Sequence, residues 1–421
     1  MNAMIEKLLH TPEGVRDIYG KEYEMKFHIE KTLHHVMKLH GFKGIETPTF
    51  EFFDIFNKER GTIASRDMYK FFDREGNTLV LRPDITPSIA RCAAKYYKEE
   101  GFPIRLCYIG NTFIHNSSYQ GKLKEITQLG AELINDGSME ADAQIIALTI
   151  ECLLKAGLTE FQVEIGEADF FRSLVNEANF NEEEEEELRI LIENKNLFTV
   201  EEILLHKSIS GKLKEVFLTL PNLFGNMDTL NLAKSLTDNS RALQAIQRLE
   251  GIYNILTIYG YEKYITFDLG MLNKYNYYTG IIFNVYTYGT GDVIAGGGRY
   301  DNLVGQFGKK ATAIGLGIAV DQLILALTRQ GAEFESDHGN TLILYEKELL
   351  QHAVVLANHF RSTDMNIELL KKEDHTSLEA YMDYGVRSNI GGILYYKKAD
   401  EILVINCAER TQSIARIEDF M

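Results

Sequence analysis

Apolar positions in the first third of the chain follow two spacings, one typical of helices and one typical of strands. In residues 22–39 apolar side chains recur every three to four positions, which predicts an amphipathic helix that ends near Gly41. Its predicted apolar positions are Phe27, Ile29, Leu33, Val36, Met37 and Leu39. Residues 87–100 and 140–156 also predict helices.

Short apolar segments between and after these helices predict strands. They cover residues 44–49, 71–72, 78–82, 106–114, 280–288 and 292–295. Residues 74–77 have the composition of a hairpin turn that would pair the second segment with the third, and 289–291 join the last two. Hairpins mixed with long helices favour an α+β fold, with an antiparallel sheet flanked by helices, over a parallel doubly wound sheet.

The rest of the chain predicts a helical insertion and a second domain. Residues 171–262 are helical in pattern, and Asn181 followed by six glutamates is typical of a capped helix start, which we favour over a site for a metal or a basic partner. A polar linker covers 331–340, and 341–421 alternates strands and helices as in a small α/β unit with parallel strands. We therefore expect a core of residues 1–330, with its insertion at about 171–262, and a C-terminal domain of residues 341–421.

Composition narrows the classes of function. The 421 residues carry a net charge of −17, which argues against broad binding to phosphate backbones. A protein with this net charge can still have a local basic face. No apolar run reaches the length of a membrane span, and the first residues lack the apolar core of a signal peptide. The four cysteines have no paired spacing and are interpreted as buried free thiols. We expect a cytoplasmic protein.

Candidate chemistry from short motifs is sparse. The segment GGGRYD at 296–301 is glycine-rich but is no phosphate-binding loop, because no Gly-Lys-Ser/Thr follows it. Its glycines serve either close strand packing or a ligand lying over the strand, and Arg299 is interpreted as a structural ion-pair partner rather than a ligand contact. The 11 histidines form no zinc-binding spacing, and no catalytic triad is recognisable. We expect no metal and no cofactor.

A longer segment, RLCYIGNTFIHNSSYQGKLKEITQLGAELIN at 105–135, resembles motif 2 of histidyl-tRNA synthetase, a class II aminoacyl-tRNA synthetase. That family places an arginine for the ATP α-phosphate where this chain has Ile114. Two further motifs of the family each contain an arginine whose positions here are Asn273 and Gln322, the latter in the pair Asp321-Gln322. An aliphatic or amide side chain offers no guanidinium fork to a phosphate or carboxylate. The resemblance thus implies that adenylation residues are missing.

The amino-acid side of the same resemblance persists. It assigns histidine binding to Asp84, Thr86, Gln128, Glu132, Tyr277 and Tyr278. Taken singly, Asp84 and Glu132 are better interpreted as ordinary surface carboxylates, and Tyr277 is equally well interpreted as core packing. Their order along the chain favours a ligand pocket, because a ligand ammonium needs carboxylates and an imidazole needs hydrogen-bond partners.

This combination resembles the family of ATP phosphoribosyltransferase regulatory subunits, paralogues of histidyl-tRNA synthetase, from Thr11 to about Leu327. The resemblance implies a class II synthetase-like sheet and a C-terminal domain similar to a shortened anticodon-binding domain, for which an unrelated α/β appendage is the alternative. It also implies a non-catalytic protein that binds L-histidine and a short-form ATP phosphoribosyltransferase, as a homodimer built through residues 44–56 within a hetero-oligomer.

The chain departs from both families at Lys122, where they have arginine. Lysine lacks the planar fork of a guanidinium group, which weakens any anion site there. The alternatives are an active histidyl-tRNA synthetase and a stand-alone histidine sensor. We expect no membrane and no tRNA as partner.

Overall fold

A computed structural model describes residues 9–56, 63–115, 123–272, 278–288, 290–332, 340–398 and 400–420. The chain divides into two units, residues 1–332 and 333–421, and each is described by itself. Among the described residues, no helix is both long and apolar enough to cross a membrane.

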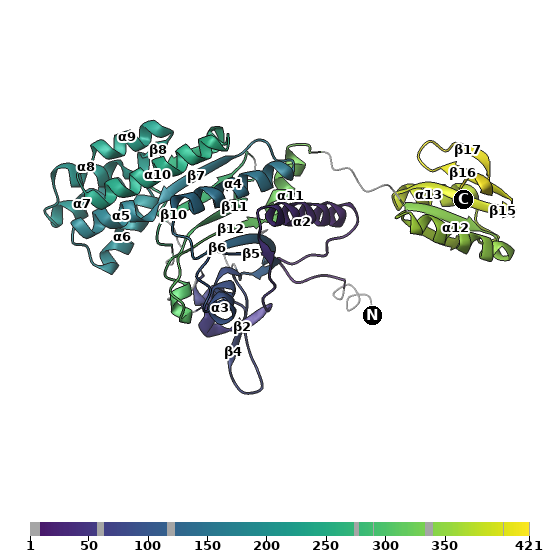
Figure 1. The fold of residues 1–421 in the computed structure, drawn as a ribbon, viewed down its shortest axis with the longest axis horizontal. Helices are drawn as coiled ribbons and strands as arrows, with labels where there is room; N and C mark the ends of the chain where they lie inside the picture. Colours follow the sequence, from purple (N-terminus) through teal and green to yellow (C-terminus); the bar gives the residue numbers. More distant parts are fainter. Residues whose placement is uncertain are drawn as a thin grey trace. The chain divides into compact units, whose positions relative to one another are not determined.

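The first unit is organised around a sheet of nine strands among the described residues (Figure 1). Neighbouring strands are antiparallel except for the pairs β1–β5 and β7–β9, which are parallel. In spatial order the strands are β1 (Lys43–Gly44), β5 (Ile104–Phe113), β6 (Glu125–Ile134), β12 (Ala313–Ala319), β11 (Ala295–Arg299), β10 (Ile281–Tyr286), β7 (Gln162–Glu167), β9 (Ile265–Asp268) and β8 (Phe224–Gly225). The predicted α+β class is confirmed.

Three helices cover one side of this sheet (Figure 1). They are α2 (Lys21–Leu39), α4 (Met139–Lys155) and α11 (Val320–Arg329); α2 contacts both of the others, and the three pack on strands β5, β6 and β12. Ile29, Leu33, Val36 and Met37 of α2 are buried as its spacing predicts. Phe27 and Leu39 are exposed, so their assignment to the buried face was wrong: the Phe27 ring stacks on that of Tyr23 along the outer surface.

A smaller sheet lies beside α3 (Thr86–Tyr96) and has the order β2 (Phe50–Phe52), β4 (Thr78–Leu81) and β3 (Lys70–Phe72). The predicted hairpin is confirmed, and the Asp73 carboxylate accepts hydrogen bonds from Asn77 across its turn. The strand predicted over 44–49 is wrong beyond Gly44, which ends β1. Pro48 has no N–H for a ladder, and the Thr47 carbonyl accepts a hydrogen bond from the Arg82 guanidinium group.

The insertion is helical as predicted and consists of α5 (Ala168–Glu177), α6 (Glu182–Glu193), α7 (Leu197–His206), α8 (Gly211–Thr219), α9 (Met227–Ser235) and α10 (Ser240–Ile258). Strand β8 interrupts it and pairs with β9, which the helical pattern missed. Asn181 and Glu184 form a capping box at the start of α6, so the glutamate run is a solvated helix start. The strand predicted at 292–295 instead begins at Ala295 and continues through the glycines to Arg299.

The second unit has a five-stranded sheet in the order β14 (Ile367–Lys371), β13 (Asn340–Tyr345), β15 (Ile390–Lys398), β16 (Glu401–Asn406) and β17 (Gln412–Arg416). The first three strands are parallel and are connected through α12 (Leu350–Ser362) and α13 (Leu378–Arg387). The last two are antiparallel, so the expectation of parallel strands holds for the first three only. A two-residue connection between β15 and β16 is too short for a parallel crossover.

Candidate functional site

A cavity of about 1070 Å³ lies over the nine-stranded sheet, within the first unit. Its walls come from β5, β6, β10, β11 and β12, from the segment that precedes α3, and from the insertion near Lys195 and Phe224. Five of the six residues that the sequence assigned to a histidine site line it together: Asp84, Thr86, Gln128, Glu132 and Tyr278. The sixth, Tyr277, lies outside the described residues.

Glycines on β6, β11 and β12 make room for the polar side chains of this cavity. A methyl group on Gly315 would lie 1.7 Å from the Glu132 carboxylate, and one on Gly317 would lie 2.3 Å from the Gln128 amide nitrogen. On the neighbouring strand a methyl group at Gly298 would lie 2.8 Å from the Tyr278 ring. The glycines therefore serve both strand packing and the site, since each one leaves space that a polar or aromatic side chain occupies.

Glu132 is the centre of the polar cluster. Its side chain is buried at 1% exposure, which excludes its interpretation as a surface carboxylate. Its carboxylate accepts a hydrogen bond of 2.7 Å from the Thr86 hydroxyl and one of 2.5 Å from the Tyr300 hydroxyl. Burial raises the pKa of Glu132 to about 8, and the nearby Asp84 carboxylate adds to this rise, while the two hydrogen bonds oppose it. A buried acid with a strongly raised pKa in a cavity is a feature of many functional sites.

Asp84 lies two residues before α3, where its carboxylate oxygen accepts hydrogen bonds from the backbone N–H groups of Ile85 and Thr86. These contacts fix the carboxylate at the cavity wall near Glu132, and its charge contributes to the raised pKa of Glu132. Two carboxyl groups on one wall, with hydroxyls and an amide beside them, form a site suited to a cationic nitrogen.

Sequence reasoning missed two residues of this site, Tyr300 and Tyr108. Tyr300 is part of GGGRYD, but its contact with Glu132 joins residues that are 168 positions apart. Tyr108 lines the cavity from β5, where it pairs with Gly130 of β6. The available sequence signal for Tyr108 was the alternation of side chains along β5, because it places Tyr108 on the same face of the strand as Gly110.

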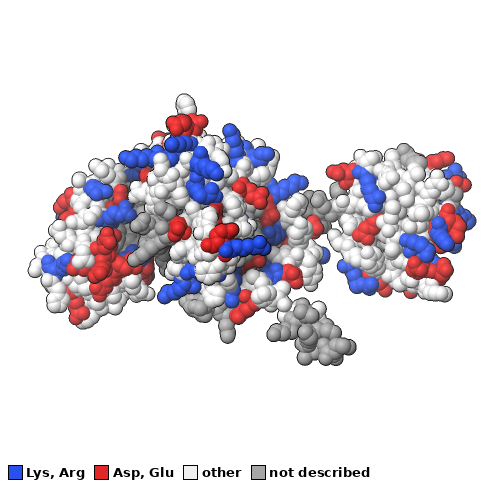
Figure 2. Space-filling view, turned by 90° about the horizontal axis from the view of Figure 1, so that it is seen from below, with Lys and Arg blue, Asp and Glu red and all other residues white. Residues whose placement is uncertain are grey.

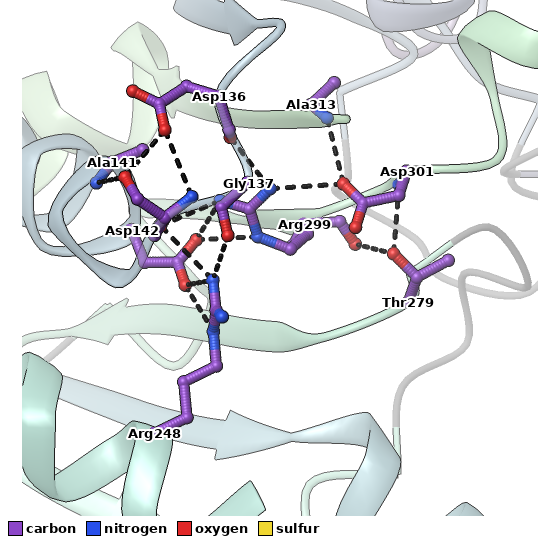
Figure 3. A network of polar contacts seen from close by, with 10 residues as sticks. Asp136, Gly137, Ala141, Asp142, Arg248, Thr279, Arg299, Asp301 and Ala313 are labelled. Atoms are coloured by element: carbon purple, nitrogen blue, oxygen red, sulfur yellow. Dashed lines mark hydrogen bonds and ion pairs between the residues drawn. The ribbon is translucent and has the colours of Figure 1, made fainter. Parts of the chain in front are cut away.

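Arg299 is confirmed as a structural ion-pair partner (Figure 3). Asp142 of α4 is fully buried, and its two oxygens bind the guanidinium groups of Arg299 and of Arg248 from α10. Arg299 also contacts Asp301, whose backbone N–H donates to Thr279. This network connects the end of β11, and hence the backbone before Tyr300, to a helix of the insertion.

The three positions that the resemblance linked to ATP differ in where they lie. Ile114 lines the cavity. Gln322 does not line it, and the preceding Asp321 carboxylate accepts a hydrogen bond of 2.9 Å from the backbone N–H of Thr127. Asn273 and Lys122 lie outside the described residues. Among the described lining residues the only lysine or arginine is Lys195. The carboxylates of the lining are those of Asp67, Asp84, Glu132, Glu193 and Asp268.

Other candidate chemistry is limited. Within the described parts of the chain, no group of three or more His, Cys, Asp and Glu side chains has the arrangement of a metal site. Cys92, Cys107, Cys152 and Cys407 are all buried free thiols, as predicted from their spacing. Burial raises the pKa of each of these thiols, so they are poor nucleophiles.

Comparisons with known proteins show the family of the chain. The family model for histidyl-tRNA synthetase matches residues 14–323. The ATP phosphoribosyltransferase regulatory subunit of Acetivibrio thermocellus is 38% identical over 418 residues, covering 99% of this chain and 100% of that protein. This chain belongs to the ATP phosphoribosyltransferase regulatory subunit family. The family member from Clostridium acetobutylicum is 42% identical, over 77% of this chain and 80% of that protein.

Solved structures give the same assignment. A protein from Bacillus halodurans, described as an ATP phosphoribosyltransferase regulatory subunit/histidyl-tRNA synthetase, superposes with a TM-score of 0.82 at 33% identity, over 92% of this chain and 98% of that one. Histidyl-tRNA synthetase from Nostoc gives a TM-score of 0.79 at 19% identity, over 97% of both chains. The second likeness shows that the regulatory subunit family shares the fold of the synthetases.

Proposed function

We propose that this chain is a non-catalytic subunit that binds a short-form ATP phosphoribosyltransferase, is needed for the first step of histidine biosynthesis, and relays feedback by histidine. The observation that carries the proposal is the match, over nearly its full length, to relatives named as regulatory subunits of that enzyme. A partner of this kind supplies the chemistry on ATP, so the chain itself needs no phosphate site.

Histidine is the proposed ligand of the cavity. Asp84 and Glu132 would receive its ammonium, Thr86 and Gln128 would complete the hydrogen bonds, and Tyr278 would face the imidazole. The proximity of the first four to one another, and the burial of Glu132, support this assignment. Tyr277 belongs to the same proposal through the resemblance alone. Feedback requires that histidine bind one state of the complex more tightly than the other.

Adenylation is the activity that we propose this chain has lost. Ile114 gives the cavity wall an aliphatic side chain at a position where the synthetases have arginine. Besides Glu132, whose raised pKa favours its neutral form, the described lining carries four acidic side chains and one lysine, an excess of acidic groups that disfavours a polyphosphate by charge repulsion. The test is pyrophosphate exchange with histidine and ATP. Exchange well above the buffer rate would favour the alternative, an active histidyl-tRNA synthetase.

Assembly with the transferase is tested by mixing the two proteins at micromolar concentrations and measuring the mass of the product by size-exclusion chromatography with light scattering. A complex, together with transferase activity that depends on this chain and falls when histidine is added, is the expected result. Separate elution with a transferase that is fully active alone would reject the proposal. Histidine binding without any assembly would favour the second alternative, a stand-alone sensor.

A homodimer through residues 44–56 is part of the proposal. Phe50, Phe52 and Phe71 share one face of the three-stranded sheet, since Phe52 and Phe71 both pair with Leu79. They are exposed at 52%, 54% and 38%, and the rings of Phe50 and Phe71 are in contact. Exposed aromatic side chains clustered in this way are typical of interfaces.

The division into a core of residues 1–330 and a domain of residues 341–421 is also proposed, with the second domain as a shortened relative of the anticodon-binding domain. Its parallel strands β14, β13 and β15, connected by helices, support that relation. We propose that tRNA is not a partner. Acidic and basic side chains are interspersed over the face shown in Figure 2, and the net charge is −17.

A further inference from the structure

The five-stranded sheet of the second unit has one edge strand that is open to further pairing. β17 is the last strand in the spatial order, so it pairs with β16 on one side and with no described strand on the other (Figure 1). Its pairing with β16 runs from Gln412 to Arg416 without a shift of register. An edge strand of this kind presents a row of N–H and C=O groups that can bind another strand.

The hydrogen bonds of the β16–β17 hairpin show which backbone groups of β17 face inward. The backbone N–H of Asn406 donates to the carbonyl of Thr411 at 3.0 Å, at the closed end of the hairpin. Hydrogen-bonded and non-hydrogen-bonded positions alternate along an antiparallel pair. Ser413 and Ala415 therefore direct their backbone groups toward β16, and the residues between and beside them direct theirs away from the sheet.

Three residues of β17 have outward backbone groups: Gln412, Ile414 and Arg416. The Arg416 N–H is already satisfied, because it donates to the Asp419 carboxylate at 3.0 Å. Since no described strand lies beyond this edge, Gln412 and Ile414 each keep an N–H and a carbonyl for a further strand. The Ile414 side chain is also 68% exposed, so the edge carries an apolar side chain at its centre.

The other sheet edges among the described residues are protected. In the first unit the edge strands β1, β8, β2 and β3 are only two or three residues long. At the opposite edge of the second unit's sheet, β14 ends in Lys371, and its Ile367 carbonyl accepts a hydrogen bond of 2.8 Å from Arg361. Short length, lysines and covering side chains are common protections of an edge. β17 has five residues and contains neither lysine nor proline, so its edge has none of these protections.

The sequence of β17 is complementary to itself. If two copies pair antiparallel about a two-fold axis at Ile414, the two Ile414 residues exchange both of their outward hydrogen bonds. Ser413 of one copy then lies opposite Ala415 of the other, and these small side chains permit the close approach of a non-hydrogen-bonded pair. Gln412 lies opposite Arg416, so no like charges oppose each other.

We infer that β17 is an interface at which two copies of this chain join the sheets of their second units into one antiparallel sheet. The symmetry about Ile414 selects a second copy as the occupant, because an extended segment of another protein would need no such symmetry. The contact is separate from the proposed homodimer through residues 44–56, and it depends neither on histidine nor on the transferase. One strand pair buries less surface than the roughly 1,200–2,000 Å² of a stable interface, so the contact is weak unless another contact already holds the chains together.

The variant Ile414→Cys tests the inference in the full chain. In the paired dimer the two residues at this position have a Cα separation of about 5.5 Å, which a disulfide can span. Mild oxidation with copper phenanthroline should convert most of the protein into a dimer on a non-reducing gel, and a reductant should reverse it. The four native cysteines are buried, so they contribute little background.

Gln412→Cys is the matched control. Its position is exposed and lies on the same outer edge, but in the proposed register the two cysteines are about 14 Å apart along the strands and should not link. Leu370→Cys, on β14 and 38% exposed, is the control for the opposite edge of the sheet and should not link either.

Hydrogen exchange provides a test on the wild-type chain. The amides of Gln412 and Ile414 should exchange several-fold more slowly at submillimolar than at low micromolar protein concentration. Ile414→Lys should abolish this dependence on concentration, because it places two ammonium groups opposite each other. Its thermal midpoint should match that of the wild type, since the replaced side chain is exposed.

Three results would overturn the inference. Oxidation that links Gln412→Cys or Leu370→Cys as fast as Ile414→Cys would show random collision rather than a defined register. Absence of a cross-link in Ile414→Cys, with exchange at β17 that does not depend on concentration, would show that the copies do not pair there. Slowed exchange at β17 that appears only when the transferase is added would assign the edge to that protein instead of a second copy.

Discussion

Glu132→Gln is expected to change how the stability of the first unit depends on pH. Burial raises the pKa of Glu132 from an ordinary 4.5 to about 8, so the folded protein holds this proton more tightly than the unfolded chain does. The stability that this proton confers is therefore fully present below pH 4.5 and is lost as the pH rises to about 8. At about 1.4 kcal/mol for each unit of pKa, the change amounts to roughly 5 kcal/mol.

The glutamine variant isolates this effect because it has the same shape and does not titrate. Its amide oxygen accepts from one of the two hydroxyl groups that contact Glu132, and its amide nitrogen faces the other. Between about pH 5 and 8 the wild type should lose stability relative to Glu132→Gln, by an amount on the order of 10 °C in thermal midpoint. Glu164 and Glu167 also have pKa values raised mainly by burial, to about 7 and about 8, so the comparison must be the difference between the two proteins.

Thermal unfolding followed by circular dichroism, at several pH values and constant ionic strength, measures that difference. Glu187→Gln, at an exposed position of α6, controls for the loss of one carboxylate. The reasoning is refuted if the midpoints of wild type and Glu132→Gln run parallel across this range. It is also refuted if the wild type gains stability relative to the variant as the pH rises, because a raised pKa requires the opposite sign.

Three further variants test other parts of the structure. Asp142→Asn leaves its two arginine partners without their buried carboxylate and should lower the free energy of unfolding by about 3–5 kcal/mol in denaturant titrations. Asp238→Asn removes an exposed ion pair with Lys212 and should lower it by less than about 1 kcal/mol. Gly315→Ala places a methyl group 1.7 Å from the central glutamate carboxylate of the cavity and should abolish measurable histidine binding in calorimetry, whereas Gly305→Ala, with nothing within 4 Å, should bind normally. Ile114→Arg should leave histidine-dependent pyrophosphate exchange at the buffer rate, because two other cationic positions of the synthetases stay unfilled, and measurable exchange in this variant would show that the single arginine suffices.

Local spacing and the order of motifs along the chain determined much of what could be predicted. The helix at Lys21–Leu39, the turn that joins Phe72 to Thr78 and the capping box at Asn181 all depend on residues within a few positions of one another. For such elements the chain itself brings the interacting groups together, so their sequence is sufficient. The five described residues of the predicted histidine site were found from motif order, and the fold does place all five on one cavity.

Tertiary structure decided the features in which distant segments meet. The Tyr300 hydroxyl donates a hydrogen bond to Glu132, which is 168 positions away in the sequence. Tyr108 lies opposite Gly130 because of the register between β5 and β6. The strand expected at 44–49 ends at Gly44, and the Thr47 carbonyl instead accepts a hydrogen bond from the side chain of Arg82, 35 positions away. Strand register and the partners of a buried polar group depend on the whole sheet being assembled. A sequence pattern shows which face of a strand a residue is on, but not which residue of another strand will lie opposite.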